Sequence, residues 1–338
     1  MNTLIEESKV LITSFELPQK QKIPPHLKKK KVIVIAGPTG VGKTQISLRI
    51  AKVSGGEIVS ADSMQVYRGM DIGTAKVSTD EMMQVPHHLI DVRDISQTFN
   101  VKDFYDEAMT AIKGIIVRGH VPIVVGGTGF YTHALIYGPP SGPPSVPEVR
   151  SRLEREMDEQ GSLALFDRLR HLDPEYAGTI TQRDRHKIIR ALEIITLTNQ
   201  KVSHFVKGAA GDHENYDFRC WFLHLPKELL YARINQRCDE MIAKGFVDEV
   251  KRLEKQGLRL NTSASQAIGY RQCLEYLAKT ETKENFDYFV DDFKRASRRY
   301  AKRQFTWFKK EPLFRWLDLD TTTTEHAIEH ILQDFEVS

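Results

Sequence analysis

Apolar residues follow two alternating patterns in the first half of the chain. Short β-branched or aliphatic runs, which are typical of buried strands, occur in KVIVIAG, EIVSADS, HHLIDV and VPIVVGG. Between them lie segments such as TQISLRIAKV and VKDFYDEAMTAIKGIIVRG, in which apolar residues recur at helical spacing. CWFLHL, residues 220–225, has the pattern of a further strand. Strands that alternate with helices form parallel sheets, so we predict an α/β fold with a parallel sheet flanked by helices.

A different pattern separates the last two of these predicted strands. YGPPSGPPSVPEV is rich in Pro and Gly and predicts a stiff linker that leaves the sheet. The segment that follows is helical in pattern, and HKIIRALEIITL places Ile188, Leu192 and Ile195 on one face. We therefore predict an all-helical insertion domain at residues 141–217.

The remaining chain divides into a core and a tail. Residues 31–140 and 218–338 supply the predicted strands and form the expected core, which from Lys227 onward has a helical pattern with one short loop. Residues 1–30 contain prolines and no sustained period, which predicts a flexible tail.

Composition limits the compartment and the class of protein. No apolar run approaches the roughly 20 residues that span a bilayer, and the N-terminus lacks the basic-then-apolar order of a signal peptide. The three cysteines, Cys220, Cys238 and Cys273, are too widely spaced for a zinc site, and an odd number does not suit a disulfide framework. We expect a cytoplasmic protein with no membrane segment.

Positive charge is concentrated in two places, although the net charge is only +3. Lys28–Lys31 and Lys294–Lys310 are dense in Lys and Arg, and aromatic residues are interleaved in the second stretch. Such patches suit a polyanion, but a solvated helix face explains the pattern equally well. We interpret Trp307 and Phe308 as core residues rather than stacking platforms, because adjacent aromatic residues on helices usually pack.

The stretch GPTGVGKT fits the phosphate-binding pattern G-x-x-x-x-G-K-[ST] and lies between a predicted strand and a predicted helix. Its glycines let several backbone N–H groups point at one anion, and the helix N-terminus adds its positive end. The lysine neutralises phosphate oxygens, and the threonine hydroxyl can hold Mg²⁺. The predicted sheet is therefore P-loop NTPase-like. The expected residues for a polyphosphate or nucleotide are Gly37, Pro38, Thr39, Gly40, Val41, Gly42, Lys43 and Thr44, with Thr44 also the metal ligand.

Asp62 follows the next predicted strand, in the segment IVSADSMQVYRGMDIGTAK. Ligands of open α/β sheets bind at the carboxyl ends of the strands, so Asp62 should lie near the phosphate loop. It can act as a general base, a magnesium ligand or a turn-forming cap, and these alternatives remain open. Apart from Asp91, no acidic residue follows an apolar strand as in an ATPase, which weakens an NTPase interpretation.

Several further motifs occur in one order: HHLIDV, VPIVVGGTGFY, RALE, GYRQ and YAKRQFTWF. Together with GPTGVGKT and SADSMQVYRGMDIGTAK, they closely resemble the tRNA dimethylallyltransferases of the bacterial type, also called tRNA isopentenyltransferases. The similarity extends from about Val32 to Trp316, and DSMQVYRGMDIGTAK is far more diagnostic than the phosphate loop.

The resemblance implies a monomeric enzyme that transfers a dimethylallyl group from dimethylallyl diphosphate to N6 of the adenosine 3′-adjacent to the anticodon, with Mg²⁺ as cofactor. The catalytic residues would be Asp62 as general base, Thr39 as donor to the bridging oxygen, and Arg237 as phosphate contact. Arg233 lies four residues before Arg237 on the same predicted helix face and is a further candidate for diphosphate binding. The loop would then stabilise a departing diphosphate.

The same resemblance implies binding of the tRNA anticodon stem-loop, with the target adenosine flipped out. The insertion would clasp the anticodon arm, and Lys294–Lys310 would contact phosphates. Lys187 departs from the family, since relatives commonly carry arginine there and lysine cannot form a bidentate fork. The expected tRNA-binding residues are Asp62, Ser63, Met64, Gln65, Thr128, Arg150, His186, Lys187, Ile188, Ile189, Arg190, Gln266, Ala267, Ile268, Gly269, Tyr270 and Arg271.

Two other functions fit parts of the sequence. A small-molecule kinase of the phosphate-loop class would use Lys43 and Thr44 equally well, and the helical insertion could supply the arginines of a lid. A non-catalytic tRNA-binding protein with a relic loop is a third alternative, against which the intact phosphate loop and Asp62 argue.

Overall fold

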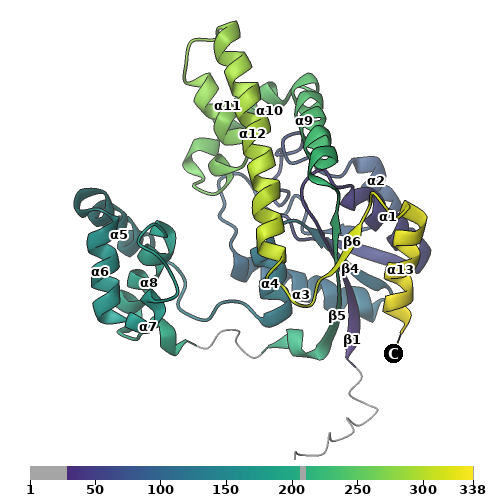
Figure 1. Ribbon diagram of the computed structural model, residues 1–338, viewed down its shortest axis with the longest axis horizontal. Coiled ribbons are helices and arrows are strands. Elements are labelled where there is room, and N and C mark those ends of the chain that lie inside the picture. Colours follow the sequence, from purple (N-terminus) through teal and green to yellow (C-terminus); the bar gives the residue numbers. More distant parts are fainter. Residues whose placement is uncertain (1–28, 206–210, 338) are drawn as a thin grey trace, which may run out of the picture.

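Six parallel strands form one sheet in the order β3-β2-β4-β1-β5-β6 (Figure 1). The computed structural model describes residues 29–205 and 211–337, so residues 1–28 of the predicted tail lie outside the described residues. The predicted α/β fold with a parallel, P-loop NTPase-like sheet is confirmed. The strands are β1 (Lys30–Ala36), β2 (Gly56–Ser60), β3 (His87–His88), β4 (Val121–Gly126), β5 (Tyr216–His224) and β6 (Arg315–Asp318).

Helices cover both faces of this sheet. On one face α1 (Lys43–Ser54) packs against α13 (Thr324–Glu336), and on the other α3 (Val101–Val117) packs against α4 (Gly129–Tyr137). Four more helices stand beyond the carboxyl ends of the strands (Figure 1). They are α9 (Lys227–Ala243), α10 (Phe246–Lys255), α11 (Tyr270–Leu277) and α12 (Lys283–Phe308), and the short α2 (Thr79–Gln84) precedes β3.

β1 lies where the strand order reverses. The chain passes from β1 to β2 on one side and from β4 to β5 on the other. Residues 32–36 of β1 are completely buried, because both faces of the strand are covered. Ligands of open α/β sheets bind beyond the carboxyl ends of the strands at such a reversal, next to the paired residues Ala36 and Gly126.

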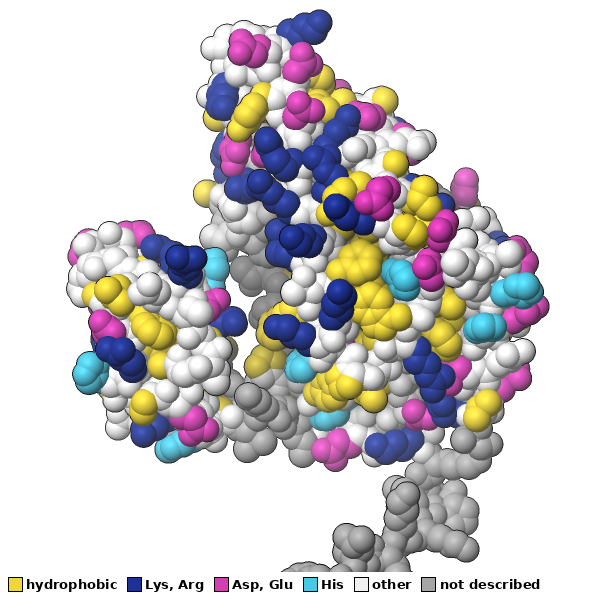
Figure 2. All heavy atoms as spheres, in the orientation of Figure 1, with side chains coloured by type: hydrophobic (Ala, Val, Ile, Leu, Met, Phe, Trp, Pro, Cys, Tyr) yellow, Lys and Arg dark blue, Asp and Glu magenta, His cyan; other side chains and the backbone are white. Residues whose placement is uncertain are grey.

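Four helices between β4 and β5 form a separate group beside the sheet (Figure 1). Their apolar faces pack around a second core, in which Ile188 and Leu192 are buried and against which Ile195 packs, as their spacing predicted. Figure 2 shows a hollow between this group and the rest of the molecule. The helices are α5 (Pro147–Gln160), α6 (Ser162–Leu172), α7 (Pro174–Ala177) and α8 (Arg185–Thr198).

Two parts of the sheet differ from the prediction. In HHLIDV the strand is limited to β3, because Leu89 and Asp91 have φ angles of 63° and 54°, in the left-handed region. We predicted only helices and one short loop after Lys227, and this prediction was wrong for residues 315–318. They form β6, which pairs with β5 at the edge of the sheet. Leu317 is the buried residue of this short strand, so the pattern lacks the alternation that identifies a strand.

All three cysteines are buried free thiols in the main core. In the part of the chain that the structure describes, no helix is both long enough and apolar enough to cross a membrane.

Candidate active site

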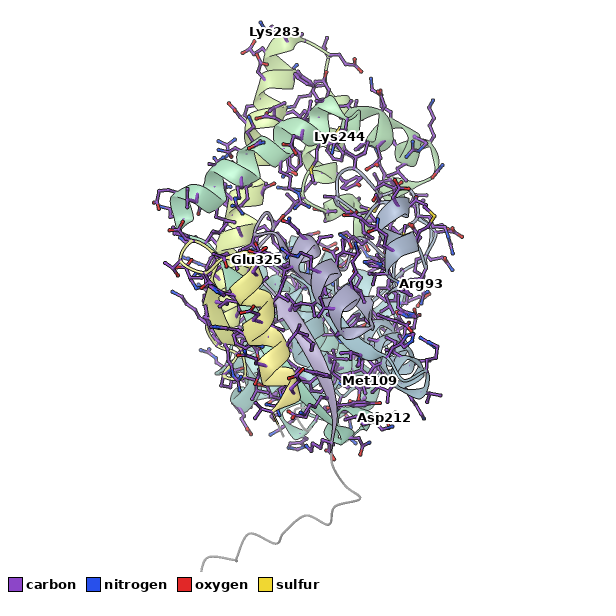
Figure 3. All side chains as sticks on the ribbon, turned by 90° about the vertical axis from the view of Figure 1, so that its right-hand side faces the viewer. Arg93, Met109, Asp212, Lys244, Lys283 and Glu325 are labelled. Atoms are coloured by element: carbon purple, nitrogen blue, oxygen red, sulfur yellow. The ribbon has the colours of Figure 1, made fainter. Side chains whose placement is uncertain are left out.

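A cavity of about 980 Å³ opens at the carboxyl ends of β1, β2 and β4, between the sheet and helices α9 and α12. Lys244, which caps α9, and Lys283, the first residue of α12, mark the end of the molecule where these helices extend beyond the strands (Figure 3). The loops after the three strands each contribute lining residues, among them Thr39 and Asp62. The two strongest sequence signals therefore face the same cavity.

The phosphate loop has the geometry of an anion site. Gly40 and Gly42 have φ angles of 79° and 103°, which favour glycine. Gly42 precedes α1, and no side chain in the described part of the chain caps this helix, so its first backbone N–H groups are available to an anion. The predicted phosphate-binding residues that line the cavity are Thr39, Gly40, Gly42, Lys43 and Thr44. Those that are buried behind the loop are Gly37, Pro38 and Val41.

Lys43 is held by its own loop. Its Nζ donates to the carbonyl oxygens of Gly37 at 2.8 Å and Pro38 at 2.9 Å. Desolvation, followed by the positive charge of Arg237, lowers the pKa of Lys43 from 10.5 to about 7, and Asp62 only partly opposes the shift. Negative charge from a bound phosphate group would raise this pKa again, so the lysine suits a polyanion better than a neutral ligand.

The Thr44 hydroxyl fits a magnesium ligand. Thr44 is exposed to the cavity in the first turn of α1, and no described residue forms a hydrogen bond with its hydroxyl. Within the described residues, no group of three or more His, Cys, Asp or Glu side chains could hold a metal ion by itself. Since Mg²⁺ prefers oxygen ligands and keeps several waters, one hydroxyl combined with phosphate oxygens and water suits it.

Asp62 forms the turn after β2 with one of its two carboxylate oxygens. Oδ1 accepts hydrogen bonds from the backbone N–H groups of Met64 at 2.8 Å and Gln65 at 3.3 Å. No described residue donates to Oδ2. The N–H of Ser63 donates to Oγ1 of Thr128 at 3.3 Å, which joins the loops after β2 and β4. The turn-forming and general-base interpretations are therefore compatible, because a different oxygen serves each.

Helix α9 contributes two arginines to the cavity. Arg237 is half-buried, whereas Arg233, one turn earlier, is exposed. Desolvation lowers the pKa of Arg237 and the nearby Asp62 opposes that shift. Lys43 and Arg237 thus place two cations near one carboxylate, and this charge pattern suits a ligand with several negative charges.

Helix α12 supplies two site residues that were not predicted, although both lie in the motif YAKRQFTWF. Oε1 of the buried Gln304 accepts from the N–H of Thr39 at 3.0 Å, and its Nε2 donates to the carbonyl oxygen of Gly127 at 2.9 Å. Tyr300, one turn earlier, forms a hydrogen bond with Thr128, and desolvation raises the pKa of its phenol. Positions 300 and 304 are four residues apart on one helix face, and this period was the signal that could have identified them.

Two of the predicted tRNA-binding residues, Gly269 and Tyr270, are buried, and Tyr270 supports the loop at residues 71–73. Tyr270 is completely buried and donates to Oε1 of Glu249 at 2.6 Å. The same buried carboxylate accepts the three backbone N–H groups of residues 71–73. Gly269 has a φ angle of 88°, and a Cβ there would lie 2.7 Å from the ring of Phe293. The predicted residues of this segment that line the cavity are Gln266, Ala267, Ile268 and Tyr270, and Arg271 is exposed.

The predicted tRNA-binding residues at the start of α8 differ in their exposure. His186 and Lys187 are exposed. Ile188 and Ile189 are buried in the second core, so their side chains cannot contact an RNA. Helical spacing places Ile188 on the inner face of α8, so its side chain is not exposed on the surface.

The two predicted arginines of the insertion are engaged within the protein. Arg150 forms an ion pair with Glu154 at 3.0 Å along α5. Arg190 donates to the buried carboxylate of Glu193 at 2.7 Å and also to the carbonyl oxygen of Pro143. Arg190 therefore ties α8 to the linker that precedes α5.

The basic stretch 294–310 contains both paired and unpaired cations. Lys294 forms an ion pair with Asp239 at 2.6 Å, and Arg295 forms one with Asp292 at 3.0 Å. Lys and Arg side chains gather over α12 on the face drawn in Figure 2. Within the described residues, the exposed cations of the stretch that have no ion pair are Arg299, Lys302, Arg303, Lys309 and Lys310.

The two adjacent aromatic residues at the end of α12 differ in exposure. Phe308 is completely buried, as predicted. Trp307 is 40 % exposed, so its assignment to the core was wrong. Successive positions of a helix point about 100° apart, and here one of the two points outward.

Known proteins similar to this chain modify tRNA. The model of a family described as IPP transferase matches residues 65–311. A tRNA dimethylallyltransferase of Protochlamydia amoebophila is 56 % identical, over 98 % of this chain and 97 % of the relative. A tRNA dimethylallyltransferase of Chlamydia abortus is 48 % identical, over 93 % of this chain and 92 % of the relative.

Solved structures of transferases are also similar to this chain. The full-length tRNA isopentenylpyrophosphate transferase of Bacillus halodurans is 41 % identical with a TM-score of 0.66, over 91 % of this chain and 97 % of that one. A eukaryotic dimethylallyltransferase acting on tRNA is 30 % identical with a TM-score of 0.73, over 88 % of this chain and 78 % of that one.

Proposed function

Because the chain belongs to the IPP transferase family, we propose that it is a tRNA dimethylallyltransferase. It transfers the dimethylallyl group of dimethylallyl diphosphate to N6 of the adenosine 3′-adjacent to the anticodon and releases diphosphate. The observation that carries this proposal is that the phosphate loop and Asp62 line one cavity. A leaving group held by the loop and a proton acceptor can therefore act on the same reaction.

The phosphate loop binds the diphosphate of the donor. The uncapped N-terminus of α1 and Lys43 stabilise the charge that grows on the diphosphate as it leaves. The Thr39 hydroxyl donates to the bridging oxygen, and Arg237 contacts the phosphates. Thr44 would hold Mg²⁺, which would supply further positive charge to the leaving group.

The apolar part of the cavity holds the prenyl chain. Apolar walls beside the reacting carbon would limit hydrolysis of the donor. The apolar lining residues include Ile234 and Met241 of α9, Ile268 of the loop before α11, and Phe293 of α12.

The acceptor amine reacts at the carbon that carries the diphosphate. The carbon–oxygen bond breaks and its electron pair leaves with the diphosphate, while the N6–carbon bond forms. The proton of N6 passes to Oδ2 of Asp62, the oxygen that no described residue occupies. An exocyclic adenine amine is a weak nucleophile, so a positioned base is worth about 10²- to 10⁴-fold in rate.

The tRNA approaches the hollow between the core and the helical group α5 to α8 (Figure 2). The target adenosine must leave the anticodon loop to reach the cavity, and flipping is least costly from a single-stranded loop. Exposed cations on α12 and on the insertion, including Lys187, contact phosphates. We propose that the enzyme is a monomer, and its substrate implies the cytoplasm.

A competition between substrates tests this function. The protein is incubated with ATP, labelled dimethylallyl diphosphate and unmodified tRNA. We expect label in the RNA and intact ATP. Turnover of ATP without label in the RNA would instead identify a small-molecule kinase.

A further inference from the structure

Two aromatic side chains remain exposed beside the loop that follows β4. Phe130 of α4 is 44 % exposed and Trp307 of α12 is 40 % exposed. Their ring centroids are 6.3 Å apart at an angle of 70°. We call Phe130 and Trp307 the aromatic pair.

The Trp307 ring is held rigidly by its neighbours. It packs on the backbone of Gly129, where a Cβ would collide with the indole. His133 packs edge-on at 6.4 Å, and its Nδ1 lies 2.9 Å from Oε1 of Glu311. A ring that is already fixed loses little conformational entropy when a ligand stacks on it, so the aromatic pair is suited to binding.

The aromatic pair lies directly next to the proposed active site. Phe130 is two residues after Thr128, whose hydroxyl accepts from the N–H of Ser63. Trp307 is one helical turn, about 5.4 Å, beyond the cavity-lining residues Arg303 and Gln304. A nucleotide attached to an adenosine inside the cavity can therefore reach the aromatic pair.

The surroundings of the aromatic pair are basic. Lys302, Arg303, Lys309 and Lys310 are exposed, lie within five residues of Trp307 on α12 or just after it, and have no ion pair within the described residues. Exposed aromatic rings bordered by cations are the arrangement that binds single-stranded nucleic acid, through base stacking and phosphate contacts. The charge complements an RNA backbone.

We propose that the aromatic pair stacks on the base that adjoins the target adenosine in the anticodon loop. The inference rests on the proposed function and adds a positioning role. When the target adenosine leaves the loop, its neighbour loses a stacking partner. The aromatic pair replaces that partner and so stabilises the flipped-out arrangement of the RNA.

The test is a double-mutant cycle between the protein and the RNA. Dissociation constants are measured for a fluorescein-labelled anticodon stem-loop, and for the same RNA made abasic at the nucleotide 5′ or 3′ of the target adenosine. Trp307→Ala should weaken binding of the intact RNA by about 5- to 100-fold. It should weaken binding of one of the two abasic RNAs much less, because the stacking partner is already absent.

Three controls separate stacking from structural damage. Trp307→Phe should restore most of the RNA affinity, because a ring is retained. Tyr288→Ala removes a 60 % exposed ring at the far end of the same helix and should leave RNA affinity unchanged. The affinity of Trp307→Ala for dimethylallyl diphosphate should also stay unchanged.

The outcomes distinguish this inference from the proposed function. If the unmodified protein transfers the prenyl group but Trp307→Ala loses equal affinity for intact RNA and both abasic RNAs, the stacking role is wrong. Unchanged RNA affinity of both Trp307→Ala and Phe130→Ala would overturn it as well. If the unmodified protein neither binds the stem-loop nor transfers the prenyl group, the proposed function itself fails.

Discussion

Asp62 holds its own turn with one carboxylate oxygen, and the other has no partner among the residues that the structure describes. The backbone N–H groups of Met64 and Gln65 fix the carboxylate, so it needs little reorganisation to accept a proton. Lys43 and Arg237 lie close enough to interact with it. A carboxylate positioned in this way suits a base that acts beside a bound polyanion.

Two substitutions of Asp62 separate its roles. Asp62→Asn keeps an oxygen for the turn but removes the base, so we expect kcat/KM to fall by about 10²-fold or more. Its affinities for donor and RNA should remain within about threefold, because neither contact is lost. Asp62→Ala should show the same loss of activity and also unfold more easily by about 1 kcal/mol, because the turn is lost.

Steady-state kinetics measures kcat/KM, ligand titration measures the affinities for donor and RNA, and urea unfolding measures the stability. Near-normal kcat/KM in Asp62→Asn would show that another group takes the proton. Equal stability of the two variants would show that the turn does not depend on Oδ1.

Single residues were predictable where a local motif fixes them. The phosphate loop and Asp62 follow strands, and a strand end is visible in the sequence. The burial of Tyr270 was not predictable because it depends on Glu249, a partner on another helix. Gln304 was missed because its partners, Thr39 and Gly127, follow strands far away in the sequence.

At the level of elements, one buried carboxylate of β2 joins β2 to β3 and to the segment between α3 and β4. Glu57 of β2 is 3 % exposed and accepts from Arg118, after α3, at 2.9 Å and 2.7 Å. His88 of β3 and His120, just before β4, each lie 2.7 Å from its oxygens. The hydrogen bonds from Arg118 are the largest of several causes that lower the pKa of Glu57 to about 2.

This shift predicts the pH range in which Glu57 stabilises the fold. The pKa is lower in the folded protein than the ordinary value of 4.5, so the stabilisation is present above about pH 4.5 and is lost as the pH falls toward about 2. Glu57→Gln should lower the free energy of unfolding by about 2 kcal/mol near pH 7, with a much smaller effect near about pH 3.

Urea unfolding at the two pH values measures the effect. The matched control is Glu325→Gln, because Glu325 pairs with Arg49 at 2.7 Å but is exposed, and it should change the stability little. A loss for Glu57→Gln that is the same at both pH values would contradict the role of its ionisation.

Elements were predictable where packing imposes a regular pattern. β1 is buried along a continuous run of residues, and α8 is buried along one helical face. Both patterns are visible in the sequence. β6 has no such pattern, because an edge strand is formed by pairing with β5 rather than by its own residues. β3 was predicted too long because Leu89 and Asp91 adopt left-handed backbone conformations that apolar patterning does not reveal.

In the whole molecule, a hollow separates the helical group from the rest of the protein, and Lys and Arg side chains gather over α12 on the same face (Figure 2). The helical group has a core of its own, so it can change position without exposing the core of the sheet. We propose that this arrangement lets the protein hold the anticodon arm while one adenosine enters the cavity.

Salt dependence tests the contribution of the unpaired cations. A Lys309→Ala/Lys310→Ala variant should bind the stem-loop more weakly and reduce the slope of log affinity against log salt by about 1.5. A Lys294→Ala/Arg295→Ala variant should change the slope much less, because these residues already form ion pairs. Equal slopes for the first variant and the unmodified protein would show that Lys309 and Lys310 do not contact phosphates.

The central claim is that carbon, and not phosphorus, passes to the RNA. The most direct measurement uses dimethylallyl diphosphate with radiocarbon in the prenyl group and radioactive phosphorus in the diphosphate, together with unmodified tRNA. We predict that all transferred radiocarbon is recovered as N6-(dimethylallyl)adenosine after digestion of the tRNA, and that the radioactive phosphorus is recovered as free diphosphate. Radioactive phosphorus in the RNA, or released phosphate while the prenyl group stays out of the RNA, would contradict the account.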